Sequence, residues 1–168
     1  VCMFLRETQR GRIEDATRAV SDSMARGGII YIFGCGHCHI VGEDLFYRAG
    51  GMAPVCAVLD SSLMLHEGAV KSSCLERMSG IARPLYERDG VTRDDVLFVI
   101  STSGINAVPI EMAQCAQQDG VPVIAVVSNA YAGDRSRHTS GKKLHECADL
   151  VIDNGICHGD AAVSVGES

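Results

Sequence analysis

The amino-acid sequence predicts an α/β protein: a three-layer, doubly wound, five-stranded parallel sheet flanked by helices, with flavodoxin-like or Rossmann-like topology. Five short runs rich in Val and Ile show no alternation of polar and apolar residues, which is typical of strands buried on both faces of a parallel sheet. Segments with helical spacing lie between these runs, as in α/β folds. The 168 residues fit one domain with a sizeable core, so residues 1–168 are expected to form a single domain.

Each element follows from a local pattern. Apolar residues at helical spacing from Ile13 to Met24 predict the first helix, which Gly27-Gly28 ends. A longer helical segment at 69–88 contains Gly80 and Pro84, and we expect a break at one of them. The other expected helices span 39–49, 107–118 and 141–147. The expected strands span 29–33, 54–59, 95–100, 121–127 and 149–153.

The loops that follow the strands are the expected place for a site. Right-handed crossovers bring the carboxyl ends of parallel strands to one edge of the sheet, where ligands bind near the switch in strand order. The loops at 34–38, 60–68, 101–106 and 128–140 would all face this edge. No internal repeat, linker or low-complexity segment interrupts the pattern.

Composition narrows the class of protein. The net charge of -6 and the lack of a Lys/Arg block argue against nucleic acid as a partner. The apolar runs are too short to span a bilayer, so no membrane association is expected. The eight cysteines lie mostly inside apolar segments, where Cys acts as a small hydrophobe, and we expect a reducing, cytoplasmic setting. The chain begins within a helix-like pattern and ends in a Gly/Ala/Ser-rich tail, so we expect incomplete termini and sheet-covering elements outside it.

The most informative segment is Val-Leu-Phe-Val-Ile-Ser-Thr-Ser-Gly-Ile-Asn at residues 96–106. A buried strand here leads into hydroxyl residues, Gly104 and the start of a helix near Asn106. Hydroxyl groups and free N–H groups at a helix N-terminus form an anion site. The turn contains no lysine, so it differs from the nucleotide P-loop and suits a monoester phosphate held by neutral donors. An ordinary strand–helix turn is the alternative, because Ser and Gly are common in such turns.

The first loop, Gly34-Cys35-Gly36-His37-Cys38-His39, has several interpretations. It lacks the third glycine of a dinucleotide-binding fingerprint. It matches Cys-x-x-Cys-His haem attachment in form, but a strand edge gives poor access and no export signal is visible. No second ligand pair stands at zinc-site spacing. The simplest interpretation is a glycine turn that lets the backbone approach a ligand.

Two other loops carry titratable side chains. His66 and Glu67 supply an imidazole and a carboxylate, the groups that proton transfer between adjacent carbons needs. A helix N-terminus that favours Glu67 explains the pair equally simply. The one basic stretch, at 135–143, could bring His138 or Lys142 to an anion, or could be a solvated loop with Ser140 as a helix N-cap.

Taken together, the loops resemble the sugar isomerase (SIS) domain family of phosphosugar-binding proteins. Ile-Ser-Thr-Ser-Gly at 100–104 resembles the family's Ser-x-Ser-Gly phosphate loop, and residues 34–38 resemble its Gly-x-Gly-x-Ser turn. Ala-Asp-Leu-Val-Ile at 148–152 resembles its closing strand, so the likeness covers residues 29–153. Residues 46–51, 65–68 and 136–142 are similar to an uncharacterised bacterial branch described as phosphoheptose isomerases.

The resemblance implies a phosphosugar site without cofactor or metal. The phosphate positions carry over to Ser101, Ser103 and Asn106, the last in place of the usual Ser or Thr. Cys38 replaces a serine that often touches the sugar, and a thiol is a weaker donor. The residues expected to bind phosphate or sugar are Gly36, His37, Cys38, Ser101, Thr102, Ser103, Gly104, Asn106, His138 and Lys142.

For catalysis, the resemblance implies a Glu that moves the proton between C1 and C2 and a His that opens the ring. Glu67 and His66 match by loop position, and burial beside Leu63 and Leu65 is expected to raise the pKa of Glu67. The expected activity is aldose–ketose isomerisation through an enediolate. The alternatives are a non-catalytic phosphosugar sensor, or a phosphosugar etherase or deaminase. The family likeness further implies a homodimer or homotetramer, with an apolar helix face at Val41, Leu45 and 47–52 at the interface.

Overall fold

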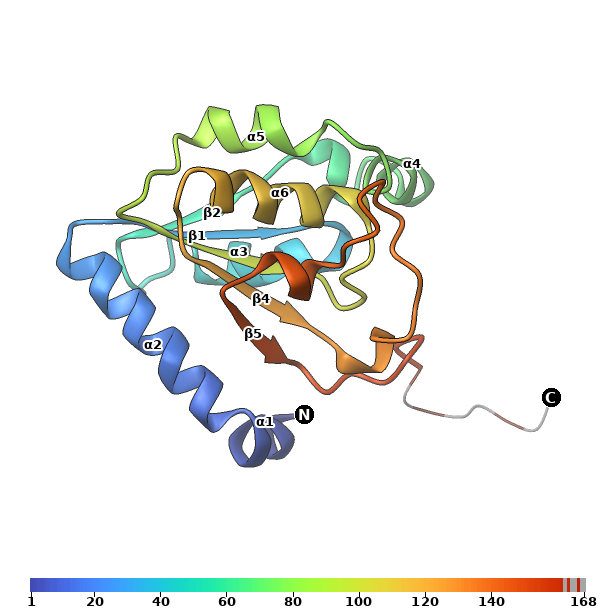
Figure 1. Cartoon of the computed structure of the whole chain (residues 1–168), viewed down its shortest axis with the longest axis horizontal. Coiled ribbons are helices and arrows are strands. Elements are labelled where there is room, and N and C mark those ends of the chain that lie inside the picture. Colours follow the sequence, from blue (N-terminus) through green and yellow to red (C-terminus); the bar gives the residue numbers. More distant parts are fainter. Residues whose placement is uncertain (162, 164–165, 167–168) are drawn as a thin grey trace.

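The computed structural model describes residues 1–161, 163 and 166, and its core is a five-stranded parallel sheet (Figure 1). The strand order is β2-β1-β3-β4-β5, so the direction of winding changes between β1 and β3. This is the flavodoxin-like order, and the predicted fold is confirmed. The strands are β1 (Ile30–Gly34), β2 (Val55–Val58), β3 (Val96–Ile100), β4 (Val123–Val127) and β5 (Leu150–Asp153).

Helices cover both faces of the sheet. On one face α6 packs over β3 and β4 with α5 beside it over β2, and on the other face α2 and α3 lie against the sheet (Figure 1). The α-helices are α1 (Cys2–Thr8), α2 (Arg10–Ala25), α3 (Ile40–Leu45), α4 (Ala69–Leu75), α5 (Ala82–Asp89) and α6 (Ala107–Gln118). The short 3₁₀ helices are η1 (Gly36–His39), η2 (Ser61–Leu63), η3 (Asn129–Tyr131) and η4 (Leu144–Cys147).

The strands lie within two residues of their predicted bounds, and the helices differ more. The expected break in the segment 69–88 falls at Gly80, which has φ +90°, while Pro84 sits in the first turn of α5. α3 ends at Leu45, four residues early, because Phe46 is extended and Tyr47 has φ +51°. The predicted helix 141–147 is wrong: only the single turn η4 forms there.

The two faces of the sheet are covered unequally. Toward α5 and α6, side chains such as Phe33, Leu97 and Val99 are almost fully buried. Toward α2 and α3, an apolar groove of about 290 Å³ remains open. Its lining residues are Val20, Ile30, Ile32, Val41, Leu45, Met52, Val55, Phe98, Ile100 and Val126. Val41 and Leu45 are 45% and 42% exposed, which confirms that this helix face is free of cover within the chain.

No helix among the residues that the structure describes has the length and apolar character needed to cross a membrane.

Candidate functional site

The turn at 101–106 is held in place by the long loop that follows β4. Three of its carbonyl oxygens accept hydrogen bonds from that loop. The bonds run from Ser128 N to Thr102 O, from Arg137 N to Ile105 O and from Leu144 N to Gly104 O, each at 2.8 Å. Because these contacts come from residues 128–144, the second loop determines the shape of the first.

Gly104 is required in the turn. Its φ of +62° lies in the left-handed region, and a Cβ added there would come within 3.2 Å of Val127. Its N–H donates to the Ser101 hydroxyl at 3.3 Å. Ser101 is buried, while Thr102 and Ser103 are half-buried and remain accessible.

Asn106 stands at the N-cap of α6 but does not cap it. An Asn at this position usually accepts hydrogen bonds from the first N–H groups of its own helix, and here no such bond forms. Its Oδ1 instead accepts from Arg137 Nη1 at 2.7 Å, and its amide faces the Glu76 carboxylate. The Asn106 side chain is therefore directed to Arg137 and Glu76 rather than to its own helix, whose second N–H, that of Val108, donates to the Glu76 carbonyl instead.

Glu76 is the carboxylate that the fold brings to this turn. It follows the last residue of α4, and its carbonyl accepts from Val108 N at 3.0 Å, which joins the end of α4 to the start of α6. Burial raises the pKa of Glu76, while the Asn106 amide and then Arg77 and Arg137 oppose the rise. A half-buried carboxyl with a raised pKa beside an anion turn is suited to proton transfer.

The turn after β1 forms a second wall. A Cβ at Gly34 would lie 2.6 Å from the Cys38 backbone, so this glycine makes room for the chain itself, and Gly36 has φ +55°. Cys38 is half-buried and faces Thr102, and burial raises the pKa of its thiol. Cys38 thus presents a neutral thiol to the site at neutral pH.

The histidines and Cys35 of this turn differ in burial and in hydrogen-bond partners. Cys35 is buried, which removes it from haem attachment. His39 Nδ1 is hydrogen-bonded to the Gly36 carbonyl, and His37 is exposed. Throughout the described ranges, no three His, Cys, Asp or Glu side chains gather where they could hold a metal ion.

His66 and Glu67 are both exposed at the start of α4. The expected rise in the pKa of Glu67 is wrong. Hydrogen bonds from Lys71, whose Nζ lies 2.9 Å from Glu67 Oε2, and from Ser61 lower this pKa instead. Leu63 and Met64 take the buried positions of the loop, which leaves the following residues on the surface.

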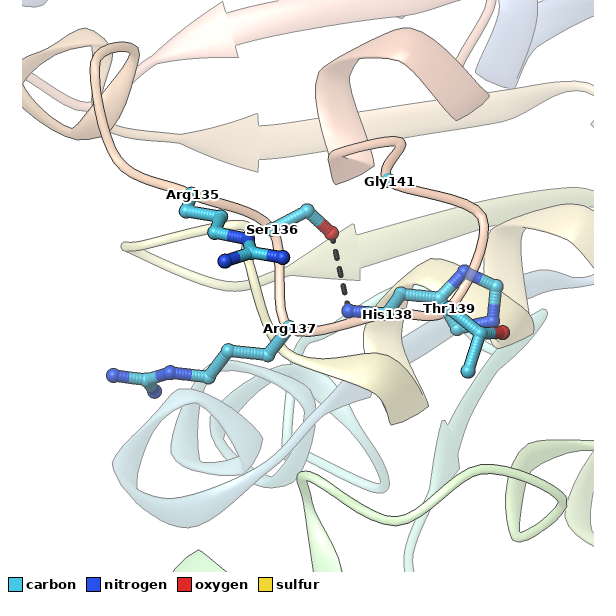
Figure 2. A pocket seen from close by; sticks show the side chains of 6 residues that line it. All are labelled: Arg135, Ser136, Arg137, His138, Thr139 and Gly141. Carbon is cyan, nitrogen blue, oxygen red and sulfur yellow. Dashed lines mark hydrogen bonds between the residues drawn. The ribbon is translucent and has the colours of Figure 1, made fainter.

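The basic loop borders an open hollow of about 600 Å³, lined by Arg135, Ser136, Arg137, His138, Thr139 and Gly141 (Figure 2). Figure 2 shows the two arginine side chains extending from one end of the loop, with His138 and Thr139 at the other end. His138 Nε2 lies 3.4 Å from Glu111 Oε1, so this histidine is engaged with α6. Lys142 is exposed, and the Ser140 hydroxyl accepts from Lys142 N in a local turn.

The two arginines of the hollow have no carboxylate partner. Ion pairs in the described part of the chain involve neither Arg135 nor Arg137. Because Arg137 is hydrogen-bonded to Ile105 and Asn106, its positive charge lies beside the turn at 101–106. The turn that contains no lysine thus gains a cation from elsewhere in the chain.

The structure brings together Cys38, Thr102 and Asn106 from the expected set, and adds Glu76 and Arg137. It leaves His66 and Glu67 on the surface and directs His138 to Glu111. One sequence signal for Glu76 existed: it lies four residues after Ser72, which is buried on the inner face of α4. A charged residue at an inward-facing helical position indicates a special role.

Comparisons with known proteins agree with this architecture. The sequence profile of the SIS domain matches residues 1–128. A UPF0309 protein of Geobacillus thermodenitrificans is 47% identical over 157 residues, covering 93% of this chain and 63% of the relative. One of Listeria innocua is 46% identical over 152 residues, covering 90% and 62%. The chain thus spans less than two thirds of the length of these relatives.

Among solved structures, a phosphoheptose isomerase from Francisella tularensis superposes with a TM-score of 0.62. It covers 89% of this chain and 74% of that protein, at 17% sequence identity, which supports the shared fold. Sequence profile, relatives and fold agree, and the chain belongs to the SIS domain family.

Proposed function

We propose that this domain binds a sugar phosphate and interconverts its aldose and ketose forms through an enediolate. Glu76 carries the proposal, because a half-buried carboxyl with a raised pKa lies next to an anion-binding turn. The family membership supports sugar-phosphate binding. The name of the Francisella tularensis structure favours an isomerase among the reactions that such a site could perform.

The phosphate end is built from the turn. Hydroxyl and N–H groups of Ser101, Thr102, Ser103 and Gly104, which lie just before the start of α6, would receive the phosphate oxygens. Arg137 would supply the positive charge. Gly36, His37 and Cys38 would line the sugar end, and Lys142 would add charge at the rim.

The reacting end is built around Glu76. Its carboxylate would take the proton from C2 of the open-chain aldose, and the electrons of the C–H bond would move to form the enediolate. The same proton would return to C1 while the O2 proton passes to O1, which yields the ketose. We propose Glu76 in place of Glu67 because Glu67 is exposed and paired with Lys71. His66, exposed beside Glu67, stays the sequence-predicted candidate for opening the sugar ring.

Removing one phosphate donor tests binding. We expect Ser103→Ala to weaken phosphosugar affinity by roughly 10- to 100-fold, because the substrate loses a hydrogen bond to a charged group. Titration calorimetry with hexose, amino-sugar and heptose phosphates measures this. Ser73→Ala, at an exposed position on α4, is the matched control and should bind as the wild type does. Equal affinity for both variants would contradict the site.

Exchanging each carboxylate for its amide identifies the base. Glu76→Gln should lower turnover by roughly 100- to 10,000-fold while phosphosugar binding remains, because the proton acceptor is lost. Glu67→Gln should keep turnover within a few-fold. An aldose–ketose assay on every phosphosugar that binds provides the measurement.

The opposite result, loss of turnover only in Glu67→Gln, would restore the base predicted from sequence. Binding without aldose–ketose turnover in the wild type would favour a phosphosugar sensor. Cleavage of an ether or release of ammonia would favour the etherase or deaminase.

Glu76 also makes stability depend on pH. Because its folded-state pKa lies above the unfolded value, the folded wild type gains stability as pH falls from the folded pKa to the usual glutamate range. Glu76→Gln should therefore be more stable than the wild type at neutral pH, and the difference should shrink as pH falls. Urea unfolding followed by circular dichroism measures it. A Gln variant less stable than wild type at neutral pH would contradict the burial penalty.

We also propose that copies of the chain pair through the exposed apolar face near α3. Met52 is 50% and Phe46 is 46% exposed there, beside Tyr47 at 94%. Light scattering should give twice the chain mass or a higher multiple, and Phe46→Glu should lower it. Val70→Glu, at an exposed apolar position on α4 away from this face, is the control. A monomeric wild-type mass would contradict the pairing.

A further inference from the structure

We propose that Asn106 and Arg137 are positioning residues that couple anion occupancy of the turn at 101–106 to protonation of Glu76. An anion in the turn favours the protonated Glu76, and protonation of Glu76 in turn strengthens anion binding. This coupling rests on the site of the proposed function and deepens it, because it makes the phosphate group of the substrate a regulator of the base.

The first link joins Arg137 to the turn. Its backbone N–H donates to Ile105 O at 2.8 Å, and its Nη1 donates to Asn106 Oδ1 at 2.7 Å. Both acceptors belong to the turn itself, so Arg137 is held at the place an anion would enter. Its present partner is a neutral amide. An anion would offer a stronger, charge-assisted and bidentate bond to the guanidinium.

The second link joins Asn106 to Glu76. Asn106 is 8% exposed and makes no cap bond to α6, so its side chain is committed to the neighbours on either side. Its oxygen takes the Arg137 hydrogen, and the amide end faces the Glu76 carboxylate. Two backbone hydrogen bonds fix the relative positions of Arg137, Asn106 and Glu76. One runs from Arg137 N to Ile105 O at 2.8 Å, and the other from Val108 N to Glu76 O at 3.0 Å.

The surroundings of Glu76 make Arg137 one of its two nearby cations. The groups that face Glu76 are Cys35 and Cys38 after β1, Arg77 on its own segment, Asn106 on α6 and Arg137 on the loop. Asp60 acts on the Cys35 thiol and Asp160 on the Cys38 thiol, both from further along the edge of the sheet. Both thiols are neutral, so the charge balance at Glu76 is set mainly by Arg77 and Arg137.

An anion in the turn changes this balance in one direction. It draws the Arg137 guanidinium toward itself and adds its own negative charge, and both effects disfavour the ionised Glu76. By linkage, proton binding at Glu76 then raises anion affinity by the same factor. In turnover, a phosphorylated sugar would meet a stronger base than an unphosphorylated sugar does.

Sulfate is the test ligand, because it stays a dianion over the working range. Calorimetric titration from about pH 5 to pH 8 should show the dissociation constant rising about tenfold in the wild type. Glu76→Gln should remove the part that belongs to Glu76 and leave a flatter pH profile.

The two arginines of the hollow give a matched pair of variants. Arg137→Gln should weaken sulfate binding and reduce the part of the pH profile that depends on Glu76. Arg135→Gln removes an equal charge from the same loop but leaves the contact between Arg137 and Asn106 in place. This variant should therefore keep the part of the pH profile that depends on Glu76. Asn106→Ala should resemble Arg137→Gln in the pH profile.

A direct reading comes from the Glu76 side-chain carboxyl carbon in NMR, assigned by its loss in Glu76→Gln. Sulfate should move its titration midpoint upward in the wild type and in Arg135→Gln, and much less in Arg137→Gln. An unmoved midpoint, or an equal pH profile in Glu76→Gln and wild type, would overturn the coupling and leave the phosphosugar site standing. No sulfate binding at any pH would overturn the coupling and the phosphate turn together.

Discussion

The site depends on three hydrogen bonds that join the loop at 128–144 to carbonyl oxygens of the turn after β3. A short turn of small residues has no rigidity of its own, and a parallel sheet supplies support only up to the last strand residue. The contacts from the second loop supply the rest. The same contacts bring a cation to a turn made of neutral donors. The residue that donates its backbone N–H to Ile105 is Arg137, and its charged side chain lies against Asn106.

Burial and function oppose each other at Glu76. A carboxylate in this position costs folding free energy, since water is partly removed from the ionised form. The fold offsets this cost with the uncharged amide of Asn106 and with the charges of Arg77 and Arg137, rather than with a close ion pair. A close pair would lower the pKa, as Lys71 does at Glu67, and would weaken the base. The two carboxylates that flank α4, Glu67 before it and Glu76 after it, therefore illustrate opposite solutions.

Sequence patterns were sufficient for the sheet and for the position of the turn at 101–106 between a strand and a helix, because both are local. Five apolar runs such as 96–100 give the strands directly, and the residues that follow a strand in a parallel sheet must lie at its carboxyl edge. The sequence did not single out Glu76 as a candidate base, because that choice depends on which face of α4 turns inward. Ser72 and Glu76 share the inner face, whereas Glu67 precedes the helix. Arg137 could be chosen over His138 only once the path of the loop was known.

The apolar groove between α2 and α3 has a practical consequence for handling this chain. Environment-sensitive dyes such as ANS fluoresce on exposed apolar surface, and the folded chain presents such surface wherever it is not paired with a second copy. A dye-monitored melt would therefore start from a bright baseline, and ligand-induced shifts would be compressed. The sequence contains no Trp and four Tyr, so intrinsic fluorescence is a weak substitute. Circular dichroism reads backbone order and calorimetry reads heat, so neither method depends on a bound dye or on intrinsic fluorescence.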